Sequence, residues 1–297
     1  MKRLPKLREE VLEANLDLVR RGLVLSTFGN ASGVSSDDGL IVIKPSGVPY
    51  DQMKPEHLVV TDMQGNVIEG ALRPSSDLPT HAALYRAFPV IGGIAHTHSE
   101  YATAWAQARR SIPCFGTTHA DYFHGPIPVT ESMSDDEIDG EYEANTGLAI
   151  IRAFEKKDPM TVPAVLVANH GPFAWGANAR KAAENAWMLE AAARMAYLTV
   201  VINPHADAIG RDTSRPPFSE KTRQSSLLRP DGYKGMIPVL ASFPISGTQR
   251  RVPVPAVAGL QRPLLWVSVV GAIFVARNVV LWRGAVKRRG SISIWRL

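Results

Sequence analysis

Four side chains suited to binding a metal ion stand in three short segments of the chain. They are one carboxylate and three imidazoles: Asp77, His96, His98 and His170. Such a set is typical of zinc. His96 and His98 end the apolar run 91–98, and residues two apart on a strand point to the same face, so both rings can bind one ion. The spacing predicts a metal site, provided that the fold brings the other two ligands to this pair.

The flanking residues indicate how the other two ligands are placed. The apolar run 164–169 predicts a buried strand that ends at His170, followed by a turn at Gly171. Asp77 is followed by Leu78 and Pro79, a pattern typical of a helix start. Taken alone, Asp77 fits a plain helix cap better than a ligand, and His170 fits a strand-end histidine with its hydrogen bonds satisfied. The His-x-His pair is what favours the metal interpretation.

The remaining histidines are weaker candidates. His81, one helical turn after Asp77, is the best alternative ligand. We expect the others to be solvated or to lie behind the ligands: His57, His119, His124 and His205.

Composition narrows the class of protein. The chain of 297 residues could form one large domain or two, and its 45% hydrophobic and 21% charged content is ordinary for a soluble globular protein. The single cysteine, Cys114, excludes an internal disulfide and a thiolate-rich zinc site. A lone cysteine and an N-terminus without the apolar core of a signal peptide predict a cytoplasmic location. The net charge of +5 does not indicate nucleic acid binding, because basic residues concentrate near the C-terminus.

Helical and strand patterns alternate through the first two thirds of the chain. Helices are expected at 5–21, 77–88, 99–109, 134–156 and 178–200. Strands are expected around 40–44, 91–98 and 164–170, and near 58–69, where a turn at 64–66 divides the segment. This order predicts an α/β domain in which helices cover a sheet, over residues 1–212. Beyond 212 the periodicity fades while proline, arginine and serine become frequent, so 213–297 is expected to be disordered or poorly packed.

Three loops of small polar residues could bind an anion. Their candidate residues are Gly29, Asn30, Lys44, Ser46, Gly47, Ser75 and Ser76. Glycine lets backbone N–H groups approach an anion, and serine hydroxyls donate to its oxygens. Ser75 and Ser76 precede a predicted helix, whose N-terminus favours a phosphate. Each loop alone is explained as well by a simple turn, but two serines beside the candidate ligand Asp77 favour a small phosphorylated substrate lying across a metal.

Six ordered motifs resemble one known family. They lie at 29–32, 44–48, 74–81, 92–99, 116–123 and 169–176. From about residue 5 to 212 the chain resembles the L-ribulose-5-phosphate 4-epimerases of the class II aldolase/adducin-head superfamily. The resemblance implies a class II aldolase-like three-layer fold with a mostly antiparallel central sheet. It also implies a cyclic homotetramer with active sites at subunit interfaces.

The resemblance assigns roles to the candidate residues. It implies Zn²⁺ bound by Asp77, His96, His98 and His170, and substrate bound by the seven residues of the three loops. Asp121 would be one of two proton-transfer residues; from the sequence alone it is better explained as a loop aspartate bonded to its own backbone. Manganese or cobalt would also suit these ligands.

The implied reaction inverts C4 of a phosphorylated pentulose. That carbon carries a C–H bond that is not acidic, so inversion requires the C3–C4 bond to break and re-form, with zinc stabilising the enediolate. Two proton-transfer groups, one on each side of the aldehyde, are then needed.

Two other functions fit the same superfamily. A sugar-phosphate aldolase would release its fragments, but aldolases of this superfamily commonly carry glutamate in place of Asp77 and lack the segment 119–123, which favours the epimerase. An inactive metal-binding homologue is the second alternative, although adducin-type heads need not keep the ligands that this chain keeps.

The chain departs from the family after Asp212. The family's second proton-transfer residue is a tyrosine in a C-terminal segment that has no counterpart here. We hypothesise a frameshift: read one nucleotide later, the codons of 213–223 and 227–231 permit the family's ending, and Met236-Ile237 then contains a stop codon. Activity of this chain would be impaired. The apolar stretch 263–276 could instead indicate a membrane anchor, but it is short for a membrane span, so we expect no membrane partner.

Overall fold

The computed structural model describes residues 3–209. Its centre is a seven-stranded sheet in the order β4-β3-β2-β1-β5-β7-β6, in which every neighbouring pair is antiparallel. The strands are β1 (Asn30–Ser35), β2 (Leu40–Ile43), β3 (Val59–Asp62), β4 (Val67–Glu69), β5 (Gly93–His96), β6 (Ala164–Leu166) and β7 (Pro172–Gly176). The predicted tail, 213–297, and its apolar stretch lie outside the described residues.

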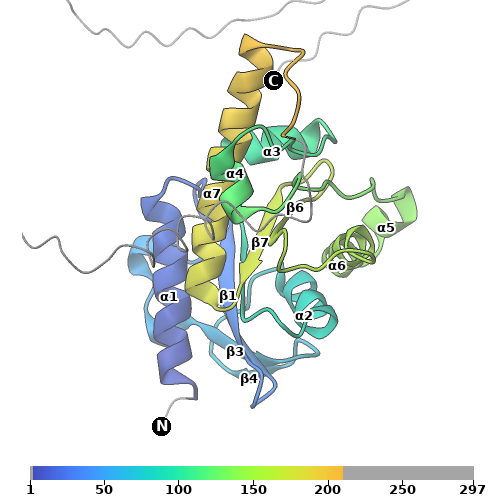
Figure 1. Ribbon diagram of the computed structural model, residues 1–297. Coiled ribbons are helices and arrows are strands. Elements are labelled where there is room, and N and C mark those ends of the chain that lie inside the picture. The colour runs from blue at the N-terminus through green and yellow to red at the C-terminus, as the bar shows by residue number, and fades with distance from the viewer. Residues whose placement is uncertain (1–2, 210–297) are drawn as a thin grey trace, which may run out of the picture. The chain divides into compact units, whose positions relative to one another are not determined.

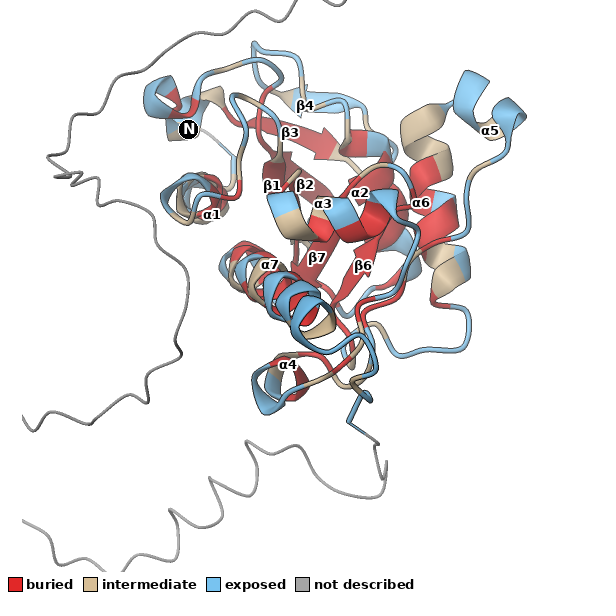
Figure 2. Ribbon diagram, turned by 90° about the horizontal axis from the view of Figure 1, so that it is seen from above, coloured by how far each residue is buried: buried red, intermediate tan, exposed pale blue. Residues whose placement is uncertain are grey.

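Helices cover both faces of this sheet and make three layers (Figures 1 and 2). The helices are α1 (Pro5–Arg20), α2 (Leu78–Ala87), α3 (Glu100–Gln107), α4 (Thr117–Tyr122), α5 (Asp135–Asp139), α6 (Tyr142–Ala153) and α7 (Ala179–Ile202), with short 3₁₀ turns η1 (Tyr50–Gln52) and η2 (Pro55–His57). One buried cluster joins α1, α3 and α7 to one sheet face, and a second joins α2 and α6 to the other. The predicted α/β fold with a mostly antiparallel central sheet is confirmed.

Alternation along the strands builds the two cores. In β5, Ala95 belongs to the α1/α7 core and Ile94 to the α2/α6 core, because successive strand residues point to opposite faces. His96 therefore points to the same side as Ile94. His96 thus faces the layer that contains α2, and Asp77 directly precedes that helix.

The start of α7 fixes the position of β5. A side chain at Gly93 would place its Cβ 2.3 Å from the backbone nitrogen of Ala179, so only glycine lets the helix approach the strand this closely. Asn178 caps α7 by accepting a hydrogen bond from the backbone N–H of Lys181 at 2.8 Å. The strand that ends at His96 is thus held in place by the N-terminus of α7, which lies much later in the chain.

Several predicted boundaries were wrong. The predicted helix 134–156 is two helices, because Gly140 ends α5 after a capping box between Ser134 and Glu137. By contrast, the strands predicted near 58–69 with a turn at 64–66 are confirmed as the hairpin β3–β4. The strand predicted to end at His170 ends at Leu166, and β7 and α4 were not predicted. Short elements carry too little periodicity to be recognised.

In the part of the chain that the structure describes, no helix combines the length and apolar character needed to span a membrane.

Candidate metal centre

Three histidines from two segments meet at the end of the sheet. His96 ends β5 and His98 follows two residues later, after the strand has ended. His170 lies in the turn between β6 and β7; because β7 pairs with β5, with Phe173 opposite His96, this turn lies beside the strand end. The ring centroids of the three histidines are 4.8, 4.9 and 5.0 Å apart, and one ring nitrogen from each lies within 4.8 Å of the others.

The turn that carries His170 has an unusual backbone. Asn169 adopts a left-handed conformation with φ of 61°, which asparagine tolerates better than most residues. The N–H of Val167 bonds across the turn to the carbonyl of Gly171 at 2.9 Å. A side chain at Gly171 would bring its Cβ 2.9 Å from the carbonyl oxygen of Thr97. The glycine therefore allows the turn to approach the His96–His98 segment.

The ring of His96 is oriented by the backbone. Its Nδ1 lies 3.0 Å from the carbonyl oxygen of Pro172, and a proton there leaves a lone pair on Nε2. That Nε2 lies 3.1 Å from Nε2 of His98. Two nitrogens bound to one tetrahedral zinc ion at about 2.0–2.1 Å stand about 3.3 Å apart. The pair therefore has a spacing suited to a shared cation.

Burial keeps these imidazoles neutral, the form that binds a metal. Burial, and to a smaller extent the neighbouring His98, lowers the pKa of His96 to about 3. Burial, and to a smaller extent the other two histidines of the cluster, lowers the pKa of His170 to about 3. The pKa of His98 is lowered by burial, although the negative charge of Asp77 partly offsets this effect. Nδ1 of His170 is buried without a hydrogen-bond partner. A buried cluster of neutral imidazoles with an unpartnered nitrogen fits a metal ion.

Asp77 stands at the N-cap of α2, but its side chain makes no capping bond. Instead its Oδ2 accepts a hydrogen bond from Nδ2 of Asn30 at 2.6 Å. The carboxylate is not part of the tight histidine group, yet its charge acts on the pKa values of His98 and His170. The structure thus brings Asp77 near the cluster. Its carboxylate is held by the side chain of Asn30 and does not cap the helix.

His81 lies behind the cluster. It is fully buried, its Nδ1 is hydrogen-bonded to Oγ of Ser32 at 2.7 Å, and that hydroxyl is bonded in turn to Tyr85 at 2.8 Å. It is not among the three histidines whose ring nitrogens converge, although its Nε2 is also buried without a hydrogen-bond partner and burial lowers its pKa to about 3.

The four other histidines are not part of the converging group. His119 is buried in α4, where its Nε2 is hydrogen-bonded to the carbonyl of Gly125 at 2.9 Å, so it is not solvated. His57 accepts a hydrogen bond from the backbone N–H of Lys54 at η2, and His205 is exposed.

The anion loops come together around Lys44. The backbone N–H of Ser75 donates to the carbonyl of Lys44 at 3.0 Å, and the N–H of Ser46 donates to that of Arg73 at 2.9 Å, which places the two serine loops side by side. Lys44 is buried and its Nζ donates to the carbonyls of Thr27 and Pro45 at 3.4 and 3.3 Å. The predicted loops therefore form one group.

The other residues of the predicted anion loops adjoin the segments around Lys44. Tyr50 donates its hydroxyl proton to the carbonyl of Gly29 at 2.7 Å, and the ammonium of Lys44 lies over the Tyr50 ring. Gly47 has a positive φ of 69° and Ser76 is exposed. Burial lowers the pKa of Lys44, while Asp77 raises it in opposition, so the cation lies within electrostatic reach of the candidate ligand. An anion bound here would lie close to a metal at the histidines.

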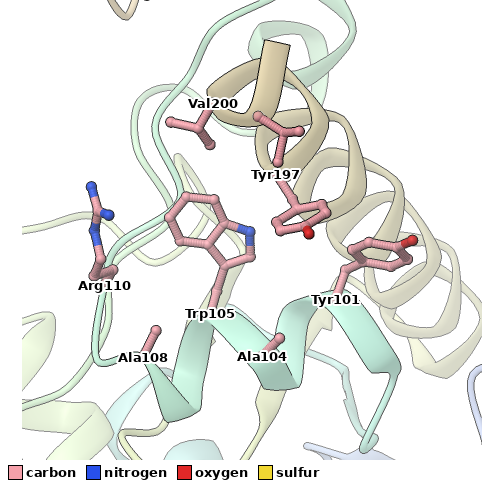
Figure 3. A pocket seen from close by; sticks show the side chains of 8 residues that line it. Tyr101, Ala104, Trp105, Ala108, Arg110, Tyr197 and Val200 are labelled. Atoms are coloured by element: carbon pink, nitrogen blue, oxygen red, sulfur yellow. The ribbon is translucent and has the colours of Figure 1, made fainter. Parts of the chain in front are cut away.

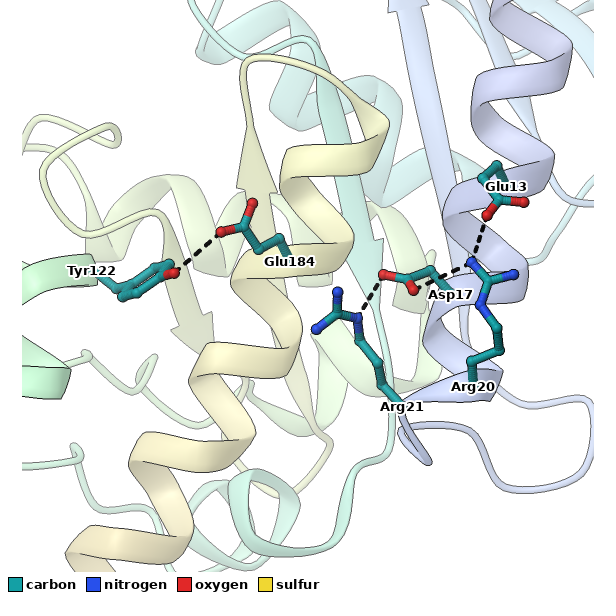
Figure 4. A network of polar contacts seen from close by, with 6 residues as sticks. All are labelled: Glu13, Asp17, Arg20, Arg21, Tyr122 and Glu184. Carbon is teal, nitrogen blue, oxygen red and sulfur yellow. Dashed lines mark hydrogen bonds and ion pairs between the residues drawn. The ribbon is translucent and has the colours of Figure 1, made fainter. Parts of the chain in front are cut away.

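Asp121 is exposed on α4, and within residues 3–209 no hydrogen bond or ion pair joins it to the three histidines. Its role in proton transfer stays a prediction. Its neighbour Tyr122 donates to Glu184 of α7 at 3.2 Å, on the face that also carries the ion pairs of α1 (Figure 4).

Sequence reasoning missed three residues around the cluster. The ring of Phe28 lies 6.1 Å from that of His98, and the ring of Tyr142 lies 5.8 Å from that of His170. The carboxylate of Glu190 in α7 accepts hydrogen bonds from the first N–H groups of α3. Only Phe28, which adjoins a candidate loop, had a position in the sequence that could have drawn attention to it.

Comparisons with known proteins agree with this geometry. The chain is 52% identical over 206 residues to the L-ribulose-5-phosphate 4-epimerase UlaF of Salmonella paratyphi B (strain ATCC BAA-1250 / SPB7), covering 69% of this chain and 90% of that protein. A solved L-fuculose 1-phosphate aldolase matches with a TM-score of 0.62 at 27% identity, over 73% of this chain and 96% of the other. YgbL of Klebsiella pneumoniae matches with a TM-score of 0.57 at 28% identity, over 70% and 95%.

The profile described as "Class II Aldolase and Adducin N-terminal domain" matches residues 9–197, which includes all four predicted ligands. The chain therefore belongs to the class II aldolase and adducin N-terminal domain family.

Proposed function

We propose that this protein is an L-ribulose-5-phosphate 4-epimerase, which interconverts L-ribulose 5-phosphate and D-xylulose 5-phosphate. The observation that carries the proposal is the 52% identity to an epimerase over nine tenths of that enzyme's length. The cluster of His96, His98 and His170 beside the Lys44 loops supports it, because a metal and an anion site lie close together. The substrate would be a small phosphorylated pentulose and not a nucleic acid, and the location cytoplasmic.

The reaction exchanges the two faces of C4 by breaking and re-forming one bond. The C4 hydroxyl loses its proton and becomes the aldehyde carbonyl of glycolaldehyde phosphate. The electron pair of the C3–C4 bond passes to the remaining three-carbon unit as an enediolate. After the aldehyde turns over, the same pair re-forms the bond on its other face, and a proton returns to the C4 oxygen.

We assign the metal ligands to His96, His98, His170 and Asp77, with zinc as the metal and manganese or cobalt as substitutes. A divalent cation held there would supply Lewis-acid stabilisation for the negative charge of the enediolate. Asn30, whose amide donates to Asp77, orients that carboxylate.

We assign the C5 phosphate to Lys44 and the neighbouring loops. The N–H groups of Ser46 and Ser75 already donate to the backbone, and two N–H groups of the Lys44 ammonium donate to carbonyls. The serine hydroxyls and the third ammonium N–H are therefore left for the anion. Ser76, Gly47 and Gly29 complete the predicted binding loops. A charged phosphate held here would keep the aldehyde fragment near the cluster between bond cleavage and re-formation.

The position of Asp121 favours a multimeric enzyme. Its exposure on α4, apart from the histidines of its own chain, is explained if it serves the site of a neighbouring subunit in a homotetramer. The apolar groove between α3 and α7, lined by Tyr101, Trp105 and Tyr197, and the exposed Val201 and Ile202 on α7 support a covered surface at this end (Figure 3).

A lyase is the second candidate, since the solved L-fuculose 1-phosphate aldolase shares the fold at 27% identity. One experiment separates the two. The zinc-loaded chain is incubated overnight with L-ribulose 5-phosphate, and D-xylulose 5-phosphate and glycolaldehyde phosphate are measured. We expect xylulose 5-phosphate, lost in His98→Ala. Predominant glycolaldehyde phosphate would favour the lyase. Neither product from a zinc-loaded chain in which the family's ending replaces 213–297 would refute both.

A further inference from the structure

An exposed phenylalanine lies at the candidate site with no role in the function proposed above. The Phe28 side chain is 63% exposed, although its ring lies 6.1 Å from the ring of the candidate ligand His98. A large apolar side chain beside a polar cluster gains little from remaining in water. Its position is better explained by contact with something that the site binds.

The loop that carries Phe28 is tied on both sides of the ring. The carbonyl of Thr27 accepts a hydrogen bond from Nζ of Lys44 at 3.4 Å, and the carbonyl of Gly29 accepts one from the hydroxyl of Tyr50 at 2.7 Å. Ser26 and Gly29 both have positive φ, of 57° and 93°. A Cβ at Gly29 would lie 3.1 Å from the carbonyl oxygen of His96, so the loop is held close to the histidine segment. The loop is therefore anchored to both the anion group and the metal group.

We propose that Phe28 is a specificity-determining residue, whose ring forms an apolar wall for the two-carbon aldehyde phosphate between Lys44 and His98. This inference rests on the proposed function and deepens it. After the C3–C4 bond breaks, glycolaldehyde phosphate is held through its phosphate, and its carbon end must turn without leaving. The face of an apolar ring offers no hydrogen bond to the aldehyde oxygen, so the fragment can rotate against it, and the ring excludes water from the enediolate.

The alternative fate of the intermediate shows what the wall prevents. If the aldehyde phosphate leaves, the enediolate takes up a proton at C3 and dihydroxyacetone is released. Retention gives epimerisation and release gives cleavage. Phe28 thus controls the partition between the two activities of the same scaffold, whereas the metal and phosphate ligands are needed for both.

The test compares Phe28→Ala with Leu25→Ala, which removes a side chain 61% exposed in the same loop. Glycolaldehyde phosphate and inorganic phosphate are titrated calorimetrically into the zinc-loaded proteins. Products from L-ribulose 5-phosphate are measured in parallel. We expect Phe28→Ala to bind glycolaldehyde phosphate about tenfold more weakly, with inorganic phosphate and zinc content unchanged, and to raise the ratio of cleavage to epimerisation about tenfold. Leu25→Ala should match the unsubstituted chain.

The outcomes separate this inference from the proposed function. If no protein turns over substrate, even with 213–297 replaced by the family's ending, but Phe28→Ala still binds glycolaldehyde phosphate selectively more weakly, the epimerase assignment fails and the inference about Phe28 is kept. If turnover is present and Phe28→Ala changes neither the selective binding nor the ratio of cleavage to epimerisation, the proposed role of Phe28 is wrong and the epimerase assignment is kept. Equal weakening of both ligands, no binding of glycolaldehyde phosphate by the unsubstituted chain, or a changed oligomeric state with unchanged partition would also refute it.

Discussion

Glu190 ties the longest helix to the segment that carries the histidine pair. Its two carboxylate oxygens accept hydrogen bonds from the backbone N–H groups of Tyr101 and Ala102 at 2.8 and 2.9 Å. These are the second and third residues of α3, which begins two residues after His98. A carboxylate at a helix N-terminus satisfies N–H groups that lack partners within the helix and interacts favourably with the helix dipole.

Glu190→Gln should disturb both stability and metal binding. The amide keeps one acceptor but turns an NH₂ group toward the other N–H, so one charge-assisted bond is lost. Such bonds are worth about 1.5–3 kcal/mol, and the partial exposure of Glu190 favours the lower end. A loss of about 1.5 kcal/mol lowers the melting temperature by roughly 3–6 °C in a domain of about 200 residues. Because His98 precedes α3 directly, we also expect zinc affinity to fall about tenfold.

The matched control is Glu184→Gln on the same helix. Glu184 contacts Tyr122 and Lys181 at 3.2 and 3.0 Å and its side chain is 36% exposed, so its loss should cost less than about 0.5 kcal/mol and leave zinc affinity unchanged. Urea unfolding and zinc titration with a competing chelator measure both quantities. If Glu190→Gln is no less stable than Glu184→Gln, the tethering argument is wrong. If stability falls but zinc affinity does not, α3 does not position His98.

Three further predictions follow from the same contacts. Chelation of the metal should lower the melting temperature. If zinc had been present at about a hundred times its Kd, the free energy of unfolding should fall by about 2.7 kcal/mol. His96→Ala should abolish this response to the chelator, whereas His57→Ala should keep it. Gly93→Ala should destabilise by about 1–3 kcal/mol, because its Cβ would lie 2.3 Å from the backbone of α7; Gly116→Ala, with open space around it, should cost under about 1 kcal/mol in the same denaturant titration. This chain should bind zinc yet turn over L-ribulose 5-phosphate weakly, and replacing 213–297 by the family's ending should restore the rate; full turnover by the unaltered chain, or coding DNA that cannot spell that ending, would contradict the frameshift.

The site was more predictable than the elements that hold it. The His-x-His pair and the serine and lysine loops were recognised because each chemical group lies within a few residues in the sequence. Asp77 was recognised too, but its local pattern indicated a helix cap. The structure shows its carboxylate bonded to Asn30, a partner 47 residues away. The strand predicted to end at His170 was wrong because a turn across Val167 and Gly171 ends it early.

The sequence by itself determined which atoms are available: imidazole nitrogens, a carboxylate, an ammonium and hydroxyls in loops that glycine keeps open. Local chemistry is written in adjacent residues, so these could be read directly. Only the tertiary structure decided that β7 pairs with β5 and brings His170 to His96, that Asp121 is exposed on α4, and that Phe28 and Tyr142 flank the histidines. The physical reason is that these contacts depend on strand pairing and helix packing between distant segments, which local periodicity does not encode.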